Sequence, residues 1–298
     1  MKKRKVQDGA SFAICICKQE SPIYFTIRGF KIFRCTNCGL IFVSPQTYTA
    51  KIYNQNYFYG ATHGFGFVNY EEDKLASKGY LDRYLSWFKK LGFKEGARVL
   101  DVGAANGFFV SLANNSGYDA VGIELSKDAV QWAQQLGRKV FQSDALSIAL
   151  TEKFDIVTVL DVLEHLPNPE AFLIKIKKNL IDSGILVINV PNAGSIFARV
   201  CGRSWHSYVP PEHLFYFSKK SLIDALERNG YEILKVRSIS KTFKAEYIYK
   251  TVINSPQVPT LFRNFLSFFR PFFASRFGNI KIYLPLFDNL TIIAKMIK

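Results

Sequence analysis

The stretch Val99-Leu100-Asp101-Val102-Gly103-Ala104-Ala105-Asn106-Gly107 indicates how this chain folds. An apolar run ends in a turn of small residues, and a segment of helical character begins at Phe108. A buried strand that enters a helix through such a turn is typical of a βαβ unit. The small residues let a ligand approach the backbone closely, although they could also serve only to pack a helix against a strand. Asp101 ends the predicted strand, and we expect its carboxylate to face a ligand cation.

Strands and helices alternate on the C-terminal side of this turn. Strands are predicted at Arg98–Val102, Ala120–Glu124, Lys139–Gln142, Asp155–Leu160 and Ile185–Val190, with helices at Phe108–Asn114, Lys127–Gln135 and Pro169–Leu180. The alternation predicts an α/β fold, with a doubly wound, mostly parallel sheet covered by helices on both faces. Further predictions are helices at Glu72–Leu91 and Ser218–Asn229, the latter capped by Ser218 and Gly230, and strands at Glu232–Ile239 and Leu290–Ile297.

Acidic residues stand at the ends of the next two predicted strands. Glu124 lies 17 residues after Gly107, where an acidic side chain can accept both hydroxyls of a ribose. Asp144 follows the next strand, where an adenine edge would lie, although it could instead cap the turn 143–147. The third and sixth positions of the G-x-G-x-x-G fingerprint are not glycine here, so a dinucleotide is disfavoured.

Four of the five cysteines form two close pairs near the N-terminus. Cys15-x-Cys17 and Cys35-x-x-Cys38 are separated by 17 residues, as in a zinc ribbon whose first pair is one residue short. Four thiolates complete a tetrahedral Zn²⁺ site, which stabilises a module too small for a core of its own. The alternatives are disulfides, which are rare in cytoplasmic proteins, or a ribbon that no longer holds metal. Cys201 is interpreted as a buried small hydrophobe.

Composition and charge limit the class of protein. With 48% hydrophobic and 21% charged residues among 298, the chain is folded and globular, and no apolar run is long enough to span a membrane. We therefore expect a cytoplasmic protein. The net charge is +15. Residues 1–50 carry 8 basic and 2 acidic side chains and residues 239–298 carry 9 and 2, which indicates contact with phosphate groups or serves solubility alone.

The chain resembles the class I S-adenosylmethionine-dependent methyltransferases, over about residues 72 to 240 plus the last strand. It is most similar to a bacterial subgroup that joins a cysteine-rich ribbon to this domain and includes sugar methyltransferases. The motifs that carry the resemblance are Cys35-Thr36-Asn37-Cys38-Gly39-Leu40, the Asp101 to Gly107 turn, Asp161-Val162-Leu163-Glu164-His165-Leu166 and Glu212-His213-Leu214-Phe215-Tyr216-Phe217-Ser218. Departures are Ala105, where many members have glycine, and the shortened first cysteine pair.

The resemblance implies a seven-stranded sheet, S-adenosylmethionine as cofactor, and a saccharide or lipid-linked saccharide as acceptor. The cofactor contacts that we expect are Asp101, Gly103, Ala104, Gly107, Glu124, Asp144 and Asp161, the last of which could instead begin a helical turn. The same resemblance divides the chain into a cysteine-rich module (1–48), a lid or linker (49–71), the methyltransferase domain (72–240), a basic aromatic helical insertion (241–281) and a final strand (282–298).

Candidates for the acceptor side are His165, His213, His206 and Tyr216. A hydroxyl acceptor needs a base, and histidine has a near-neutral pKa suited to that role. His165 follows the fourth strand of the sheet, where open α/β sheets bind their ligands. The loop 205–217 is rich in aromatic residues, which suits a sugar ring. Each histidine could instead be structural.

Two segments outside the domain suggest movement and docking. Glycines and His63 between Tyr57 and Tyr70 suggest a lid over the cofactor, or an irregular linker. The stretch 244–281 combines arginines and phenylalanines around a helix that Pro271 ends or kinks, as in a helix at a membrane interface. We therefore predict docking on an anionic membrane, peripheral at the inner face. Packing on the domain or in a homodimer is the alternative.

Two rival functions differ in class. The basic ends and the ribbon could hold RNA, as in a nucleic-acid methyltransferase. The run Asp161-Val162-Leu163-Glu164 does not match the Asn/Asp-Pro-Pro-aromatic motif expected of an enzyme that methylates base amino groups. The other rival is a zinc-ribbon binding protein whose cofactor domain no longer catalyses.

Overall fold

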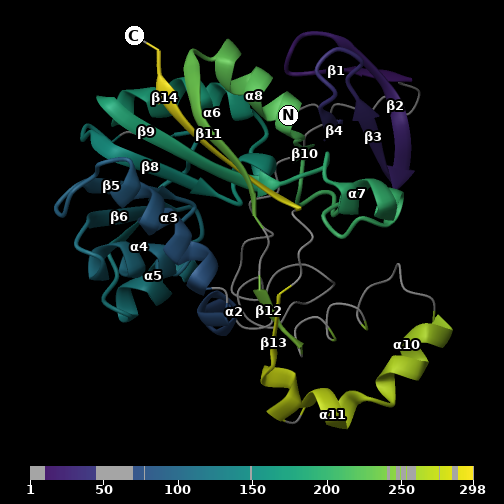
Figure 1. The fold of residues 1–298 in the computed structure, drawn as a ribbon. Coiled ribbons are helices and arrows are strands. Elements are labelled where there is room, and N and C mark those ends of the chain that lie inside the picture. The colour runs from purple at the N-terminus through teal and green to yellow at the C-terminus, as the bar shows by residue number, and fades with distance from the viewer. Residues whose placement is uncertain are drawn as a thin grey trace.

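The computed structural model describes residues 11–44, 70–76, 78–147, 150–239, 242–245, 249, 253, 260–274, 276–283 and 288–297. Its largest element is a seven-stranded sheet in the order β11-β14-β9-β8-β5-β6-β7 (Figure 1). The strands are β5 (Arg98–Val102), β6 (Asp119–Glu124), β7 (Val140–Gln142), β8 (Phe154–Leu160), β9 (Leu180–Pro191), β11 (Tyr231–Ile239) and β14 (Asn289–Met296).

The sheet is parallel from β7 to β9, and β14 runs antiparallel to both β9 and β11. This confirms the predicted α/β fold with a doubly wound, mostly parallel sheet. The chain leaves β5 toward β6 and β7 on one side and returns to β8 and β9 on the other. Such a reversal opens a crevice at the carboxyl ends of the strands, which is where α/β sheets bind ligands.

Helices cover both faces because the residues of β5 alternate between two cores. Val99 packs in one core with Phe88 of α3 and Phe109 of α4, whereas Leu100 packs in the other with Phe172 of α6. The α-helices are α3 (Lys78–Lys90), α4 (Phe108–Asn115), α5 (Lys127–Gln135), α6 (Pro169–Ile176), the short α7 (Ile196–Cys201) and α8 (Lys219–Arg228). Short 3-10 turns are η3 (Leu163–His165), η4 (Lys177–Asn179) and η5 (Gly202–Ser204).

The helix expected over Glu72–Leu91 is instead two helices, α2 (Tyr70–Ala76) and α3. They differ in what they contact. Glu71 of α2 forms an ion pair with Arg138, beside the turn that follows β5, whereas α3 buries Tyr84 and Phe88 against the sheet. One straight helix could not contact both the region of the turn after β5 and the face of the sheet.

The cysteine-rich segment forms an antiparallel sheet of β1 (Phe12–Ile14), β2 (Glu20–Ile27), β3 (Phe30–Arg34) and β4 (Ile41–Val43), with a fifth strand from far along the chain. This strand, β10 (Phe215–Tyr216), pairs with β4 and was not predicted. Phe42 stacks between Phe33 and Phe215, at ring distances of 5.9 and 6.3 Å. The ribbon and the loop before β10 therefore pack as one body.

The insertion before β14 contains α10 (Thr260–Ser267), α11 (Arg270–Ala274) and η6 (Arg276–Asn279), followed by β13 (Lys281–Tyr283), which pairs with β12 (Thr242–Lys244). The two helices lie apart from the seven-stranded sheet (Figure 1). They are separated just before Pro271, where the sequence predicted a break. Among the residues described, no helix is long and apolar enough to cross a membrane.

Candidate functional site

The backbone of the turn after β5 packs closely against Val162, which precedes η3, and against Val140 of β7. Gly103 and Gly107 have φ of +73° and +71°. A Cβ on Gly103 would lie 2.4 Å from Val162, and one on Gly107 would lie 2.7 Å from Val140. Ala105, with φ of +49°, takes the same left-handed conformation without being glycine. A non-glycine residue in this region costs about 1–3 kcal/mol, so the surrounding contacts must hold it there.

Glu124, at the end of β6, supplies that contact. Its carboxylate accepts hydrogen bonds from the amide of Ala105 at 2.9 Å and from the amide of Ser126 at 2.8 Å. The side chain is 8% exposed, and burial raises its pKa while the amide hydrogen bonds oppose the rise. The carboxylate thus lies between the turn and the start of α5, with lone pairs left for ribose hydroxyls.

Asp101 lies deeper in the same crevice. It is 4% exposed and accepts a hydrogen bond of 2.6 Å from the hydroxyl of Thr158 in β8. Burial raises the pKa of its carboxyl to about 7, against the opposing effect of the Thr158 hydrogen bond. A cation bound beside this carboxyl would restore the charge that burial disfavours.

The other two expected cofactor carboxylates differ in setting. Asp161, just past β8, has φ of +59° and accepts a 2.6 Å hydrogen bond from Asn189. A strained backbone at the carboxyl edge is typical of functional positions. Asp144 accepts a 2.9 Å hydrogen bond from the amide of Leu146, which is the turn-capping role weighed above. Contact of either residue with a cofactor remains a prediction.

Helix α2 covers the turn with residues that the sequence did not single out. Tyr70 packs against Ala105, and burial together with the carboxylates of Asp101 and Glu124 raises its pKa. Glu71 accepts a hydrogen bond from the side chain of Asn106 and forms a 2.7 Å ion pair with Arg138. No periodicity reveals such contacts, because they join segments 35 and 67 residues apart. Of the predicted lid, residues 49–69 lie outside the described part.

His165 and His213, expected on the acceptor side, lie together in the structure. Their rings are 4.7 Å apart, edge to face. Nδ1 of His165 is 2.9 Å from the carbonyl oxygen of Glu212, and Nδ1 of His213 is 2.9 Å from that of Ser207. Nε2 of His165 also lies 3.9 Å from the carboxylate of Glu164, which is 1% exposed. Burial and the neighbouring His165 lower the pKa of His213, which keeps that ring neutral.

The other two acceptor-side candidates have different surroundings. Tyr216 is 1% exposed, and its hydroxyl donates a 3.0 Å hydrogen bond to the carbonyl of His213. Burial raises its pKa far above the usual value, so this geometry favours a positioning role over a catalytic one. His206 is half exposed, and its Nε2 lies 3.4 Å from the carboxylate of Asp288 at the same edge of the sheet.

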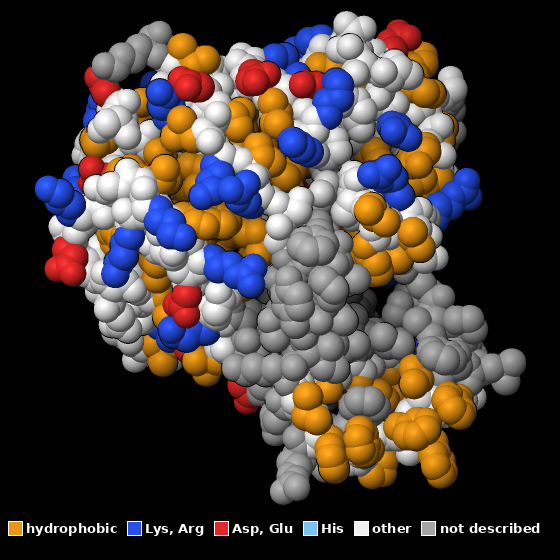
Figure 2. Space-filling model, viewed as in Figure 1, with side chains coloured by type: hydrophobic (Ala, Val, Ile, Leu, Met, Phe, Trp, Pro, Cys, Tyr) orange, Lys and Arg blue, Asp and Glu red, His pale blue; other side chains and the backbone are white. Residues whose placement is uncertain are grey.

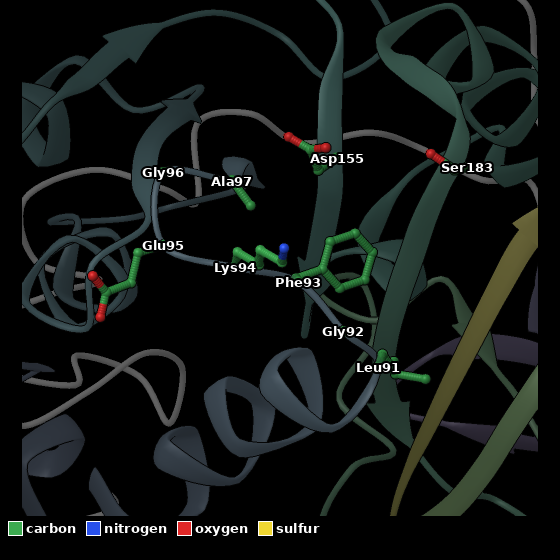
Figure 3. Close-up of a pocket in the computed structure, with 9 residues that line it drawn as sticks. All are labelled: Leu91, Gly92, Phe93, Lys94, Glu95, Gly96, Ala97, Asp155 and Ser183. Atoms are coloured by element: carbon green, nitrogen blue, oxygen red, sulfur yellow. The ribbon is translucent and has the colours of Figure 1, made fainter.

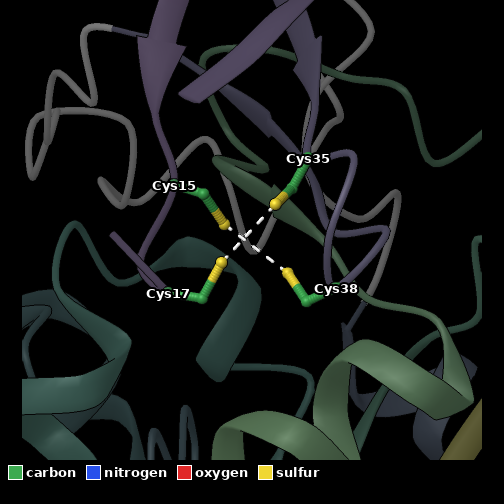
Figure 4. Close-up of side chains that lie close together, drawn as sticks. All are labelled: Cys15, Cys17, Cys35 and Cys38. Carbon is green, nitrogen blue, oxygen red and sulfur yellow. Dashed lines mark hydrogen bonds between the residues drawn. The ribbon is translucent and has the colours of Figure 1, made fainter. Parts of the chain in front are cut away.

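The four cysteines converge from two turns of the ribbon, β1–β2 and β3–β4, as Figure 4 shows. Sγ of Cys15 is 3.6 Å from Sγ of Cys38, and Sγ of Cys17 is 3.5 Å from Sγ of Cys35. None of them forms a disulfide. A tetrahedral site with Zn–S bonds of about 2.3 Å has edges of roughly 3.8 Å, so this donor set fits zinc. Cys201 is half-buried and free.

A separate hollow lies at the opposite edge of the sheet. It is lined by the loop from Leu91 to Ala97, by Asp155 near the start of β8 and by Ser183 (Figure 3). These are the amino-terminal ends of the strands, whereas Asp101, Glu124 and Asp161 lie at the carboxyl ends. Its position does not suit a cofactor of this fold.

Comparison with known proteins identifies the family. Residues 76–236, more than half of the chain, match a family described as a methyltransferase domain. The chain belongs to the S-adenosylmethionine-dependent methyltransferases. This confirms the family suggested by the sequence, and it makes the crevice beside Glu124 the place where the family's cofactor is expected.

The curated relatives of this methyltransferase include enzymes of ubiquinone biosynthesis. A ubiquinone biosynthesis O-methyltransferase of Glaesserella parasuis is 33% identical over 109 residues, or 33% of this chain and 46% of the relative. One from Bordetella avium is 27% identical over 194 residues, or 56% of this chain and 80% of the relative. The chain thus spans about half to four fifths of the length of these relatives. Their names give no support to the expected likeness to sugar methyltransferases.

Solved structures show the same fold. A chain from the complex of the Haloferax volcanii Trm112 methyltransferase activator with a methyltransferase has a TM-score of 0.53 at 14% identity, over 76% of this chain and 91% of that one. Magnesium protoporphyrin IX methyltransferase of Synechocystis PCC 6803, with bound SAH, has a TM-score of 0.50 at 16% identity, over 78% and 90%.

Replacing Glu124 with Gln should weaken S-adenosylmethionine binding about ten- to a hundredfold. The amide nitrogen of Gln cannot accept from a backbone N–H or a ribose hydroxyl, and hydrogen bonds to a charged partner are worth about 1.5–3 kcal/mol each. Calorimetric titration measures the change. Asp119→Asn is the matched control, because Asp119 begins the same strand but makes only a surface ion pair with Lys139. Equal affinity in both variants would contradict the assignment.

Binding of S-adenosylmethionine should also weaken as the pH falls through 7. The carboxyl of Asp101, with a pKa of about 7, is largely protonated at pH 6 and must lose that proton to face a cation. Affinity at pH 6 is therefore expected to be about tenfold lower than at pH 8. S-adenosylmethionine itself also titrates, but its titration affects the wild type and Asp101→Asn equally. A weaker pH dependence of affinity in the variant therefore assigns the effect to Asp101. Identical profiles would contradict it.

Proposed function

We propose that this protein transfers a methyl group from S-adenosylmethionine to a hydroxyl oxygen on a ring-bearing acceptor. The observation that carries the proposal is that the buried carboxylates of Asp101 and Glu124 and the His165–His213 pair gather at one edge of the sheet. The carboxylates suit the cation and the ribose of the cofactor, and the histidines suit a hydroxyl that loses a proton during methyl transfer. Methyl transfer itself is an in-line displacement in which positioning supplies most of the rate.

The acceptor class that we propose rests on the position of His213 and on the O-methyltransferase names of the relatives. The aromatic rings of the loop, among them Trp205 and Tyr208 at a ring distance of 5.1 Å, are buried in a core shared with the ribbon, so they hold the loop that carries His213 and do not form the open aromatic wall that the sequence suggested. The relatives named above are O-methyltransferases. A ring with adjacent hydroxyls is common to saccharides and to catechol-type phenols, and we propose this shared chemistry, with a lipid-linked saccharide as the first candidate.

We further propose that Cys15, Cys17, Cys35 and Cys38 hold one structural Zn²⁺. Cys15 and Cys17 lie between β1 and β2, and Cys35 and Cys38 lie between β3 and β4, so one ion would join these two turns. Cys35, Cys38 and Phe42 belong to the same core as Val157 of β8. The metal would therefore stabilise the strand β4 on which β10 pairs.

The insertion offers a surface for an anionic membrane. Phe265, Phe268 and Phe272 are 61%, 83% and 48% exposed. Figure 2 shows hydrophobic side chains gathered on the protruding part of the molecule, and Arg270, the first residue of α11, is exposed as well. Phenylalanines that enter the acyl boundary beside basic residues at the headgroups are typical of interfacial helices.

Turnover on a panel of acceptors tests the proposed reaction. Protein incubated with methyl-labelled S-adenosylmethionine should label a catechol or a lipid-linked glycan fraction at oxygen, as identified by mass spectrometry, and leave RNA unlabelled. His213→Ala should lower turnover at least a hundredfold, while S-adenosylmethionine affinity stays within about twofold. Labelling of RNA alone, or wild-type turnover in His213→Ala, would contradict the proposal.

Metal analysis tests the cysteine site. Protein made without a histidine tag should contain about one zinc per chain. Cys35→Ser should lose most of that zinc and unfold at a lower temperature, whereas Cys201→Ser should keep it because Cys201 lies apart from the cluster. Full zinc occupancy in Cys35→Ser, or no zinc in the wild type, would contradict the site.

Flotation with vesicles tests the membrane surface. Wild-type protein should float with phosphatidylglycerol vesicles far more than with phosphatidylcholine vesicles, and salt should weaken the binding. Phe265→Ser with Phe268→Ser should lower the bound fraction about tenfold or more. Phe141→Ser is the control, since Phe141 is 55% exposed but lies on β7. Absence from both vesicle fractions, or burial of these phenylalanines in a homodimer, would contradict the proposal.

A further inference from the structure

We propose that Glu164, His165 and His213 form a second metal site, one for a divalent transition-metal ion such as Zn²⁺ or Co²⁺. The site is separate from the cysteine cluster and combines two imidazoles with one carboxylate. Its three ligand atoms lie within 4.8 Å of one another. Imidazole and carboxylate together suit zinc and its neighbours in the first transition series.

The spacing is close to that of an occupied site. Nε2 of His165 is 3.9 Å from Oε1 of Glu164. In a tetrahedral site with bonds of about 2.0–2.1 Å, ligand atoms are roughly 3.4 Å apart. The 3.9 Å pair would therefore close by about 0.5 Å, and any pair near the 4.8 Å limit by up to about 1.4 Å, to bring the three groups onto one ion. Such a change is within the reach of side-chain torsions, without movement of the backbone.

Both histidines are held in the tautomer that binds a metal through Nε2. Nδ1 of His165 contacts the carbonyl oxygen of Glu212, and Nδ1 of His213 contacts that of Ser207, each at 2.9 Å. A carbonyl oxygen can only accept, so each Nδ1 carries the proton. In the neutral ring the lone pair is then on Nε2. Metal-binding histidines show this same pattern, in which the other ring nitrogen donates to a carbonyl or carboxylate.

The backbone around the cluster is fixed from both sides. Glu164 and His165 belong to η3, directly after β8, and His213 belongs to the loop before β10. The amide of Leu214 donates a 2.8 Å hydrogen bond to the carbonyl of Glu164, which joins the two segments. The hydroxyl of Tyr216 holds the carbonyl of His213. Ligand groups fixed in this way need little reordering when they bind an ion.

Three protein ligands leave one position open on a four-coordinate ion, as in catalytic zinc sites. An oxygen of the acceptor ring would occupy that position. Only this placement of the acceptor rests on the proposed O-methylation. The cluster lies at the carboxyl edge of the sheet, as Asp101 and Glu124 do. The ion would thus orient the acceptor oxygen toward the cofactor, and in the metal-bound form the ion, in place of a free histidine, would favour loss of the hydroxyl proton by lowering the pKa of the bound hydroxyl.

Titration with Co²⁺ alone tests the site without any need for activity. Co²⁺ bound by nitrogen and oxygen gives visible d–d absorption without the thiolate charge-transfer band of a cysteine site. Wild-type protein should show this signal, and His213→Ala and Glu164→Gln should each weaken Co²⁺ binding at least a hundredfold. His206→Ala, which removes a nearby histidine outside the cluster, should bind Co²⁺ as the wild type does.

Affinity for S-adenosylmethionine in each variant shows whether it is folded, because the cofactor crevice does not include the cluster. Undiminished Co²⁺ binding in His213→Ala and Glu164→Gln, or no Co²⁺ signal beyond that of the cysteine cluster, would overturn the proposal. In that case the histidine pair would act on the acceptor without metal. Co²⁺ binding with no methyl transfer to any acceptor would instead contradict the proposed function and leave the metal site standing.

Discussion

The hydrogen bonds that the carboxylate of Glu124 accepts, from Ala105 in the turn after β5 and from Ser126 before α5, are the contacts on which the rest of the site depends. They hold the left-handed conformation of Ala105, which costs about 1–3 kcal/mol on its own. With the turn fixed, Gly103 lies against Val162 and Gly107 against Val140, at distances that leave no room for a side chain. The same carboxylate is the group best placed for a ribose. One side chain therefore fixes the shape of the turn, and the same side chain is expected to bind the ribose of the cofactor.

The acceptor side is built differently, from segments that meet across long sequence distances. The loop 205–217 pairs with the ribbon through β10 and with η3 through Leu214 and His165. The ribbon core, where Phe42 packs on Phe215, therefore stabilises the loop that presents His213. This gives the cysteine-rich segment a role in the site although its cysteines lie outside the crevice.

The sequence predicted local features well and distant contacts poorly. The strand and turn at 99–107 were recognisable because apolar residues and small residues follow one another in a run. The pairing of β10 with β4, the contact of His165 with His213 and the position of Tyr70 over Ala105 depend on segments between 35 and about 170 residues apart. No periodicity in the sequence predicts these contacts. They depend on the order of the strands in the sheet and on which segments pack against its carboxyl edge.

A crystal structure with S-adenosylhomocysteine bound tests the central claim most directly. The account predicts that both ribose hydroxyls lie within hydrogen-bonding distance of Glu124, that the adenosine lies beside the turn of Gly103 and Gly107, and that Ala105 keeps its left-handed backbone. A ligand bound in the hollow at the amino-terminal edge, or one that leaves Glu124 in contact with Ala105 and Ser126 alone, would contradict it.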